Sequence, residues 1–387
     1  MRRGRGRRTA PDGLGAGAPA SEKGGEKQER KGVDMGKKIW VGMSGGVDSA
    51  AAAALLLEQG FETTGVTLRL RPTGAEQDIA DAQRVCRALG IEHRVLDFTG
   101  CFRRCVIAPF VEEYLAGRTP NPCVRCNQTV KFGAMLDAAL ESGADGIATG
   151  HYARVQRDPE SGRYRLYRTP SRKDQSYMLY GLTQRQLSHT LFPLAGLEKQ
   201  AVREIAEKRG LPVASKGDSM EICFVPDGSH AHFIEEYTGR PLSPGNFVDE
   251  QGCVLGRHQG ISRYTIGQRK GLGLAFGQPM YVVRIDAAKN EVVLGEEGRQ
   301  LSSCLTAREM NYIPFEPGAL TSPRRVQAKI RYQAPPADAA LIPLDTDTAR
   351  LEFDTPQRSI TPGQSVVLYD GDLVLGGGVI ADAGRPV

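Results

Sequence analysis

The sequence has no run of eighteen apolar residues among its 387, so neither a membrane-spanning helix nor a membrane partner is predicted. Its basic N-terminus is not followed by an apolar segment, so a secretory signal is not predicted either. Disulfide cross-links are not needed, because a chain of this length with 40% hydrophobic residues can bury an ordinary core. We therefore expect a cytoplasmic protein whose closely spaced cysteines are metal-binding or catalytic.

The net charge of +5 is a mild basic excess, which permits an RNA partner without demonstrating one. Residues 1–35 are rich in Arg, Gly, Lys and Glu and have no periodic apolar pattern. They are predicted to be a disordered basic extension, because such a segment cannot bury enough surface to offset its ordering entropy. An RNA-tethering arm is the alternative for the arginines in this segment, and Met35 is an alternative start.

Strand and helix patterns alternate through the next part of the chain, which predicts a doubly wound α/β domain with a parallel sheet over residues 36–230. The expected strands are 38–42, 63–70, 91–97 and 146–149, and the expected helices are 48–59, 76–89 and 135–142. After about Val225, Gly and Pro separate short β-rich runs, at 281–285, 291–294, 326–332 and 365–369. We expect a small antiparallel β-rich central domain (231–298) and a C-terminal β-barrel (299–387).

A glycine-rich turn lies between the first strand and the first helix, with the sequence Ser44-Gly45-Gly46-Val47-Asp48-Ser49. Glycines allow close backbone approach to a phosphate, and N–H groups at a helix N-terminus bind it. The Gly-Lys-Ser/Thr ending of the usual P-loop is missing, and the turn resembles the PP-loop of ATP pyrophosphatases. Because Asp48 would lie beside a phosphate, Mg²⁺ is implied. The predicted ATP-binding residues are Gly42, Met43, Ser44, Gly45, Gly46, Val47, Asp48, Ser49, Leu68 and Gly150.

Three cysteines are candidates for the chemistry that follows adenylation, because a thiolate or persulfide displaces AMP well at neutral pH. Cys123 and Cys126 form a Cys-x-x-Cys pair, and Cys223 lies about a hundred residues later. Two prolines precede the pair, which predicts a stiff loop rather than a helix there. Three nearby cations would favour the thiolate form, namely Arg118, Arg125 and Lys131.

Several further segments, with the glycine-rich turn, resemble those of tRNA-specific 2-thiouridylases, in family order from about residue 38 to the C-terminus. They are Thr119–Asn127, Ala148–Arg154, Lys173–Tyr177, the segment around Cys223, and Tyr264–Gly273. The resemblance implies a PP-loop domain, a small central domain and a β-barrel. It also implies that ATP adenylates the 2-oxygen of the wobble uridine of tRNA and that sulfur then replaces AMP.

The resemblance also implies roles for single residues. Cys223 matches the cysteine that receives persulfide sulfur from a donor protein, and Cys126 matches the one that assists sulfur transfer through a transient disulfide. The residues that match tRNA contacts are Asn121, Pro122, Cys123, His151, Lys173, Asp174, Gln175, Arg331, Tyr332 and Gln364.

Cys123 departs from the family pattern, because many members have Asp at this position, where it has been regarded as a general base. The base is therefore unassigned in this chain. The substitution also opens a second mechanism, in which Cys123, Cys126 and Cys223 bind three irons of a [4Fe–4S] cluster and the fourth iron carries sulfide. We favour the persulfide mechanism and retain the cluster as its alternative.

Other assignments remain open from the sequence alone. Cys101 and Cys105 lie four apart on an expected helix, which suits a small apolar face better than a metal pair. A basic segment with interspersed tyrosines, 154–173, fits either an RNA surface or an exposed β-hairpin. Two other functions compete with tRNA thiolation: a PP-loop ligase or amidotransferase acting on a small molecule, and a non-catalytic RNA- or iron–sulfur-binding protein.

Overall fold

The computed structural model describes residues 36–214, 216–217, 222–225 and 228–384, so the extension expected at 1–35 lies outside it. A five-stranded parallel sheet has the order β3-β2-β1-β4-β7. Its strands are β1 (Lys38–Gly42), β2 (Glu62–Arg69), β3 (His93–Asp97), β4 (Gly146–Ala148) and β7 (Thr190–Leu191). The expected parallel sheet is confirmed, with one additional short edge strand.

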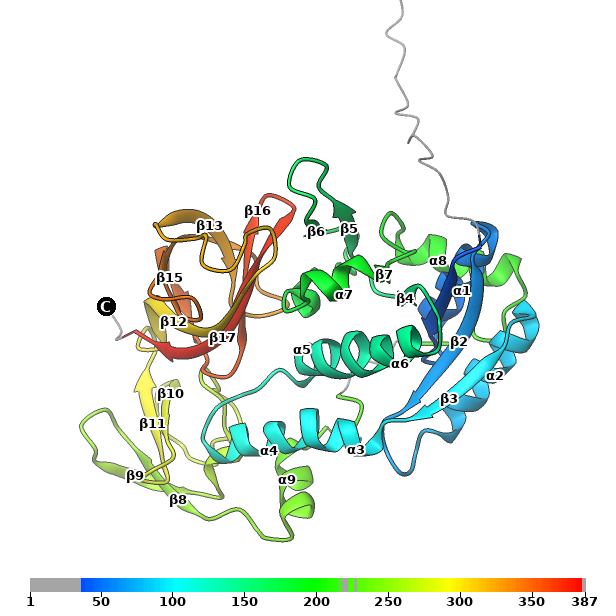
Figure 1. Cartoon of the computed structure of the whole chain (residues 1–387). Helices are drawn as coiled ribbons and strands as arrows, with labels where there is room; N and C mark the ends of the chain where they lie inside the picture. Colours follow the sequence, from blue (N-terminus) through cyan, green and yellow to red (C-terminus); the bar gives the residue numbers. More distant parts are fainter. Residues whose placement is uncertain (1–35, 215, 218–221, 226–227, 385–387) are drawn as a thin grey trace, which may run out of the picture. The chain divides into compact units, whose positions relative to one another are not determined.

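Helices cover both faces of this sheet, as a doubly wound fold requires (Figure 1). Ile39 and Val41 of β1 pack in one buried cluster with α1 (Val47–Glu58), α2 (Glu76–Leu89) and α8 (Lys199–Lys208). Trp40, between them, packs in a second cluster on the opposite face. Successive side chains of a strand point to opposite faces, so one apolar run supplies both clusters.

The second face is covered by a helical region that begins after β3. Two of its segments are π-helical. This conformation is rare in proteins, and where it occurs it is often at a functional site. In chain order the region comprises α3 (Thr99–Phe102), η1 (Arg103–Ile107), α4 (Ala108–Leu115), α5 (Pro122–Cys126), η2 (Asn127–Ala134) and α6 (Met135–Glu141). After β4 come the short helices η3 (Ser176–Leu179) and α7 (Gln184–Ser188).

The central region contains α9 (His230–Thr238), η4 (Ile261–Arg263) and a four-stranded sheet of order β10-β11-β8-β9. Its strands are β8 (Gly245–Val248), β9 (Val254–His258), β10 (Met280–Asp286) and β11 (Glu291–Glu296). The expectation of purely antiparallel pairing was wrong here, because β11 and β8 pair in parallel. The chain between them returns to the same end of the sheet, so the two strands run in one direction.

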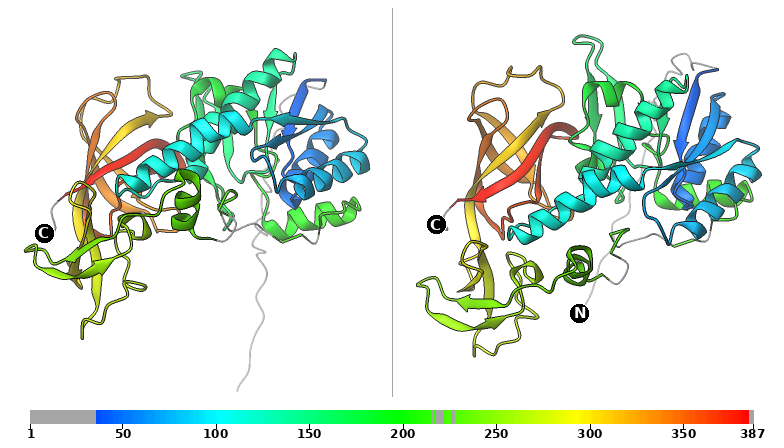
Figure 2. Two further views of the ribbon diagram at one scale, coloured as in Figure 1. Left: turned by 90° about the horizontal axis from the view of Figure 1, so that it is seen from below. Right: turned by 60° about the horizontal axis from the view of Figure 1, so that its bottom comes forward.

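Six strands close into the C-terminal barrel, coloured from yellow to red in Figure 2. They are β12 (Leu301–Tyr312), β13 (Arg324–Lys329), β14 (Ala337–Pro343), β15 (Ala349–Arg358), β16 (Ser365–Asp370) and β17 (Leu373–Ala383). Pairing of β12 with both β15 and β17 closes the ring. The expected barrel is thus confirmed.

A hairpin from the first half of the chain extends the barrel sheet. β5 (Arg154–Arg157) pairs with β6 (Tyr164–Tyr167), and β6 pairs with the start of β17. The basic segment therefore does form a hairpin. Arg163 donates to the Ile313 carbonyl at 3.3 Å, and Arg154 lies 4.5 Å from the ring centroid of Tyr167. Part of the positive charge of the hairpin thus contacts groups of the protein itself.

The loop before the cysteine pair is held by the barrel. The Thr119 amide donates to the Pro362 carbonyl at 2.9 Å, and the Gln364 side chain donates to the Thr119 carbonyl at 3.0 Å. Gly363 has a φ of +90°, and a Cβ there would lie 2.9 Å from the Thr119 amide nitrogen. This close backbone approach requires glycine.

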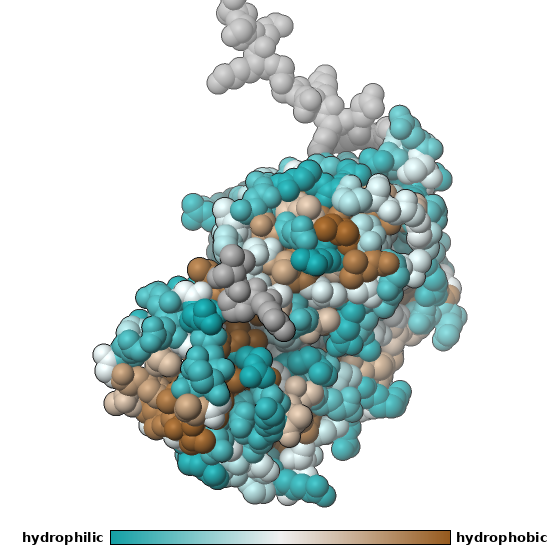
Figure 3. All heavy atoms as spheres, turned by 90° about the vertical axis from the view of Figure 1, so that its left-hand side faces the viewer, coloured by the Kyte–Doolittle hydropathy of each residue, from teal (hydrophilic) through white to brown (hydrophobic). Residues whose placement is uncertain are grey.

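The described residues contain no helix that is both long and apolar enough to cross a membrane. On the face drawn in Figure 3, hydrophobic areas are separated by hydrophilic ones. Large apolar side chains with high exposure are few and lie apart in the sequence, for example Leu115, Val254 and Leu344. Scattered exposure of this kind is normal for a protein surface.

Gly363→Ala is expected to destabilise the protein more than its matched control, Gly371→Ala. Both glycines have positive φ, but a Cβ at residue 371 meets nothing within 4 Å. The control should cost about 1 kcal/mol from backbone strain, and the clash at Gly363 should add about 1–3 kcal/mol. Denaturant unfolding of both variants measures the difference, and equal stabilities would contradict the close approach.

Candidate active site

A cavity of about 430 Å³ opens beyond the carboxyl ends of β1, β2 and β4. In open α/β sheets, ligands bind at such a point, where the strand order reverses. Many residues singled out from the sequence line it, namely Gly42, Met43, Ser44, Asp48, Ser49, Leu68, Pro122, Cys123, Cys126, Gly150, His151, Gln175 and Cys223. The structure therefore brings the glycine-rich turn and all three candidate cysteines to one space.

The glycine-rich turn is built by short contacts around Ser49. The Ser44 amide donates to the Ser49 hydroxyl at 3.2 Å, and that hydroxyl donates to the Gly46 carbonyl at 3.0 Å. Gly45 has a φ of +70°, and a Cβ there would lie 2.6 Å from the Asp78 carbonyl oxygen. Glycine is required at Gly45, where α2 passes close to the turn.

Gly150 allows the chain after β4 to approach the backbone of the glycine-rich turn closely. A Cβ at this position would lie 2.7 Å from the carbonyl carbon of Asp48 and 2.8 Å from the Ser49 amide nitrogen. The sequence suggested that a ligand approaches here. The structure places the backbone of the glycine-rich turn there instead, although Gly150 also lines the cavity.

The Asp48 carboxylate has partners within the protein. The Lys199 ammonium of α8 donates to both of its oxygens, at 2.8 and 2.9 Å, and the Tyr152 hydroxyl donates at 2.7 Å. The sequence predicted Mg²⁺ as the counter-charge of Asp48 and missed Lys199, since 150 residues separate the pair without any local signal. Lys199 neutralises the carboxylate that would otherwise repel a phosphate.

Lys199→Met is expected to weaken ATP binding about tenfold at low Mg²⁺, or about 1.4 kcal/mol. The uncompensated Asp48 carboxylate should repel the phosphates, and rising Mg²⁺ should reduce the difference by replacing the ammonium. Titration calorimetry with ATP over a Mg²⁺ series measures this. Lys208→Met, an exposed position in the same helix, is the control. Equal ATP affinity of the two variants would show that Lys199 has no electrostatic role.

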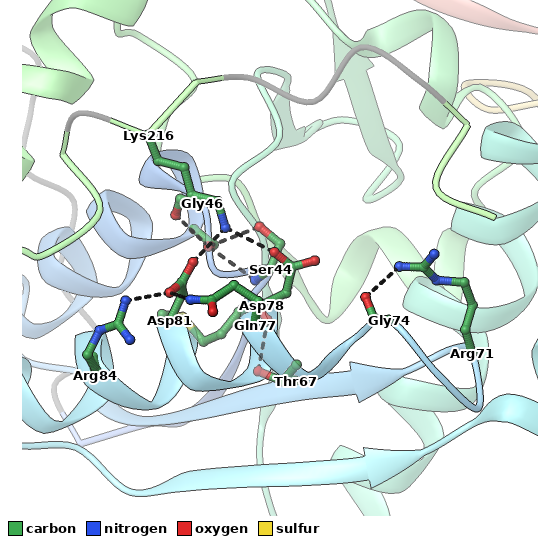
Figure 4. A network of polar contacts seen from close by, with 12 residues as sticks. Ser44, Gly46, Thr67, Arg71, Gly74, Gln77, Asp78, Asp81, Arg84 and Lys216 are labelled. Carbon is green, nitrogen blue, oxygen red and sulfur yellow. Dashed lines mark hydrogen bonds and ion pairs between the residues drawn. The ribbon is translucent and has the colours of Figure 1, made fainter. Parts of the chain in front are cut away.

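A second ion-pair network joins the segment before Cys223 to α2. The Lys216 ammonium lies 2.9 Å from an Asp78 oxygen and 2.7 Å from an Asp81 oxygen (Figure 4). Its hydrogen bond lowers the pKa of the buried Asp81, against the effect of burial. Because Asp78 also abuts Gly45, this network holds the glycine-rich turn, α2 and Lys216 in one arrangement.

The cysteine pair lies on helix α5, so the expectation of a loop through Cys123 and Cys126 was wrong. Pro122 occupies the first turn of the helix, where its missing N–H is not needed. The Asn121 side chain caps the helix by accepting from the Val124 amide at 3.3 Å. The prolines therefore set where the helix begins rather than preventing it.

The three thiols differ in their surroundings. Cys123 and Cys223 are exposed within the cavity, whereas Cys126 is only 7% exposed. Burial raises the pKa of Cys126 to about 11, Lys131 opposes that rise, and the neighbouring thiols of Cys223 and Cys123 add to it. Desolvation of the thiolate by the surrounding protein, and then the neighbouring Cys123 thiol, raise the pKa of Cys223, while Lys131 and Arg71 oppose that rise.

Of the three cations expected near the pair, Lys131 lines the cavity. Arg118 instead pairs with Glu113 at 2.6 Å, and Arg125 lies 3.8 Å from Glu309. Of these three cations, Lys131 is therefore the one that favours the thiolate forms of Cys126 and Cys223, and Arg71 also acts on Cys223.

Lys131→Met is expected to slow alkylation of Cys126 by about threefold or more at neutral pH, because the pKa of the thiol rises further without the cation. In the unchanged protein the alkylation rate should climb with pH until about 11, where the Cys126 thiol titrates. Peptide mapping after iodoacetamide treatment measures both effects. Arg125→Met is the control, and equal rates in the two variants would contradict the role of Lys131.

Cys223 is positioned by the residue that follows it. Phe224 is buried, and its ring lies edge-on to Phe102 and Phe110, with centroids 5.6 and 5.0 Å away. Edge-to-face aromatic pairs stabilise beyond their buried area. These contacts fix the chain at Cys223 against α3 and α4.

His151 follows β4 and is neutral at neutral pH, because burial, together with the positive charge of Lys131, lowers its pKa to about 3. Its Nδ1 lies 2.8 Å from the Thr149 hydroxyl. A group with so low a pKa is a weak general base. His151 therefore does not replace the Asp of related sequences in that role.

Most other predicted tRNA contacts join parts of the protein to one another. Asp174 accepts from the Thr169 amide at 2.9 Å, and its carbonyl accepts from the Tyr332 hydroxyl at 3.0 Å. Arg331 donates to the Ser359 carbonyl at 2.6 Å. Gln364 holds the Thr119 loop as described. Asp174, Arg331, Tyr332 and Gln364, with Asn121 and Lys173, lie outside the cavity lining.

A metal site at the cysteines requires side chains that converge on one point. Within the described ranges, no group of three or more His, Cys, Asp or Glu side chains is arranged to hold a metal ion. Cys123, Cys126 and Cys223 share a cavity but do not converge as cluster ligands in this conformation.

The doubly wound sheet and the glycine-rich turn at its switch point define an α/β nucleotide-binding protein of the HUP class. Residues 37–227 match a family model described as a tRNA methyl transferase HUP domain. Residues 231–296 and 302–380 match a tRNA methyl transferase PRC-barrel domain and an aminomethyltransferase β-barrel domain. The chain belongs to the tRNA-specific 2-thiouridylase family, as its curated relatives show.

One relative is the tRNA-specific 2-thiouridylase MnmA of Acetivibrio thermocellus, 52% identical over 357 residues, which cover 89% of this chain and 99% of that protein. The protein of the same name from Desulfitobacterium hafniense is 52% identical over 364 residues, covering 89% and 98%. A solved 4-thiouridine synthetase–RNA complex with bound ATP is a distant likeness, with 17% identity, coverage of 52% and 50%, and a TM-score of 0.32.

Proposed function

We propose that this protein thiolates the 2-position of the wobble uridine of tRNA at the expense of ATP. The observation that carries the proposal is that the glycine-rich turn and the thiols of Cys126 and Cys223 line one cavity. Activation by ATP and displacement by sulfur therefore take place at one uridine without its release. About 50% identity to thiouridylases over most of the chain supports the same reaction.

The first step is adenylation. The uridine 2-oxygen attacks the α-phosphorus of ATP, and pyrophosphate leaves along the glycine-rich turn. Ser44, Ser49 and the backbone N–H groups at the start of α1 bind the departing phosphates. Lys199 keeps Asp48 neutralised, and Mg²⁺ is the cation that would replace it when ATP binds.

The second step is sulfur transfer. A persulfide on Cys223, supplied by a donor protein, attacks carbon 2 of the uridine and expels AMP. The Cys126 thiolate then attacks Sγ of Cys223, which releases the 2-thiouridine and leaves a Cys126–Cys223 disulfide. Cys223 is the more exposed of the two thiols, which suits a group loaded by another protein. A reducing cytoplasm suits a cycle that needs free thiols.

Sulfur transfer fits this site better than the methyl transfer in the family-model names, because three thiols and an ATP-type turn meet in the cavity. The [4Fe–4S] alternative uses the same cysteines, with Cys123, Cys126 and Cys223 as ligands and the cluster as a carrier of sulfide. We favour the persulfide mechanism and keep the cluster as its alternative.

Iron-free protein is expected to form 2-thiouridine from ATP, Mg²⁺, unmodified tRNA and a persulfide donor, with AMP and pyrophosphate as products. Cys223→Ala should abolish product, and Cys126→Ala should retain the Cys223 persulfide but lose product release. Cys253→Ala, at an exposed cysteine outside the cavity lining, is the control. Nucleoside analysis of the tRNA and iron determination measure these outcomes.

Two results would overturn the proposal in different ways. About four irons per chain, lost in Cys123→Ala and required for activity, would establish the cluster mechanism. Formation of AMP and pyrophosphate without RNA, unaffected by Cys126→Ala, would indicate a small-molecule ligase instead.

A further inference from the structure

Two cysteines outside the cavity lining form a thiol pair. The Sγ atoms of Cys101 and Cys105 lie 4.0 Å apart, and both residues are partly exposed. The pair spans the junction of α3 with the π-helical turn η1, and residues four apart on a helix share one face. Neither thiol is used by the proposed sulfur transfer, yet their contact is close enough for a small rotation to join them.

The pair belongs to the same packed region as the catalytic thiols. Cys101 and Cys105 pack against the apolar cluster that contains Cys126. Phe102, beside Cys101, contacts Phe224, beside Cys223, and Phe102 also lines the cavity. Cys101 is also among the groups that raise the pKa of Cys126. The second thiol pair therefore lies next in the chain to a residue that lines the cavity.

The proposed cycle creates a need that this pair can meet. Each turnover leaves a Cys126–Cys223 disulfide, which must be reduced by two electrons before the next one. Cys126 is 7% exposed, so an external reductant has poor access to its sulfur and can approach the disulfide only from the side of Cys223. Thiol–disulfide exchange needs direct approach of the attacking sulfur along the disulfide bond.

We propose that Cys101 and Cys105 form a resolving dithiol that takes over the disulfide made during sulfur transfer. One thiolate of the pair attacks the Cys126–Cys223 disulfide and forms a mixed disulfide with one of its sulfurs, releasing the other as a thiolate. The second thiolate of the pair then displaces that sulfur, which leaves Cys126 and Cys223 reduced and a Cys101–Cys105 disulfide. A dithiol reductant in solution reduces this disulfide, whose two residues are both partly exposed, and is itself oxidised.

This inference rests on the persulfide mechanism, and trypsin separates the relevant thiols for its test. Cleavage after Arg103 and Arg104 places Cys101 and Cys105 on peptides 95–103 and 105–118, while Cys126 falls on 126–131 and Cys223 on 217–257, because Pro241 prevents cleavage after Arg240. Since Cys253 also lies on that last peptide, the test uses the Cys253→Ala protein. Full-length protein is loaded with inorganic polysulfide, desalted, and given ATP, Mg²⁺ and tRNA without reductant. Acid quenching, alkylation and non-reducing mass spectrometry then follow each linked peptide pair. The 126–131/217–257 pair should form first and the 95–103/105–118 pair should replace it.

Kinetics of Cys101→Ala/Cys105→Ala provide the second measurement, because alanine keeps a small apolar side chain in the cluster. The first turnover should be unchanged, while steady-state turnover under limiting dithiol should fall about fivefold or more. Excess dithiol should restore the rate, which a merely structural defect would not allow. Cys253→Ala, at an exposed cysteine away from the cluster, should match the unchanged protein in both regimes.

Persistence of the 126–131/217–257 pair, together with normal steady-state turnover of the double variant, would overturn the relay and leave the proposed function intact. Thiouridine formation without that peptide pair would overturn the relay together with the persulfide mechanism. Absence of thiouridine from the unchanged protein marks failure of the proposed function itself, and with it the relay.

Discussion

The site depends on one backbone contact, between Gly150 after β4 and the glycine-rich turn after β1. The space at Gly150 is so small that a single methyl group would meet the Asp48–Ser49 peptide. This contact holds together the two loops at the point where the strand order reverses. The cavity, the alignment of Asp48 with Lys199 and the position of the cysteines relative to the turn all follow from it.

The fold was largely predictable because its signals are local. Ile39, Trp40 and Val41 form an apolar run that must be buried on both faces, and glycine ends α2 in the left-handed conformation. The direction of short strands carries no such signal, so the parallel pairing of β8 with β11 was missed. The run expected at 326–332 ends at Lys329, because Arg331 leaves the strand to bind the Ser359 carbonyl.

The site was predictable where chemistry and spacing coincide, at the glycine-rich turn and at Cys126 and Cys223. It was not predictable where distant segments meet, as when Lys199 neutralises Asp48 or Lys216 pairs with Asp81. Residues matched by family resemblance to tRNA contacts show a further limit. Gln364 and Tyr332 hold the protein's own loops together, so a loss of activity on mutation would not by itself identify an RNA contact.

The pairing of β6 with β17 has a consequence for synthesis of the chain on the ribosome. Tyr167 pairs with Leu373, roughly two hundred residues later, so the hairpin keeps an open hydrogen-bonding edge until nearly all of the protein has been made. Exposed strand edges invite pairing with other chains. A product truncated before the last strand would retain that edge permanently, and the arginines of the hairpin are then the groups that discourage association.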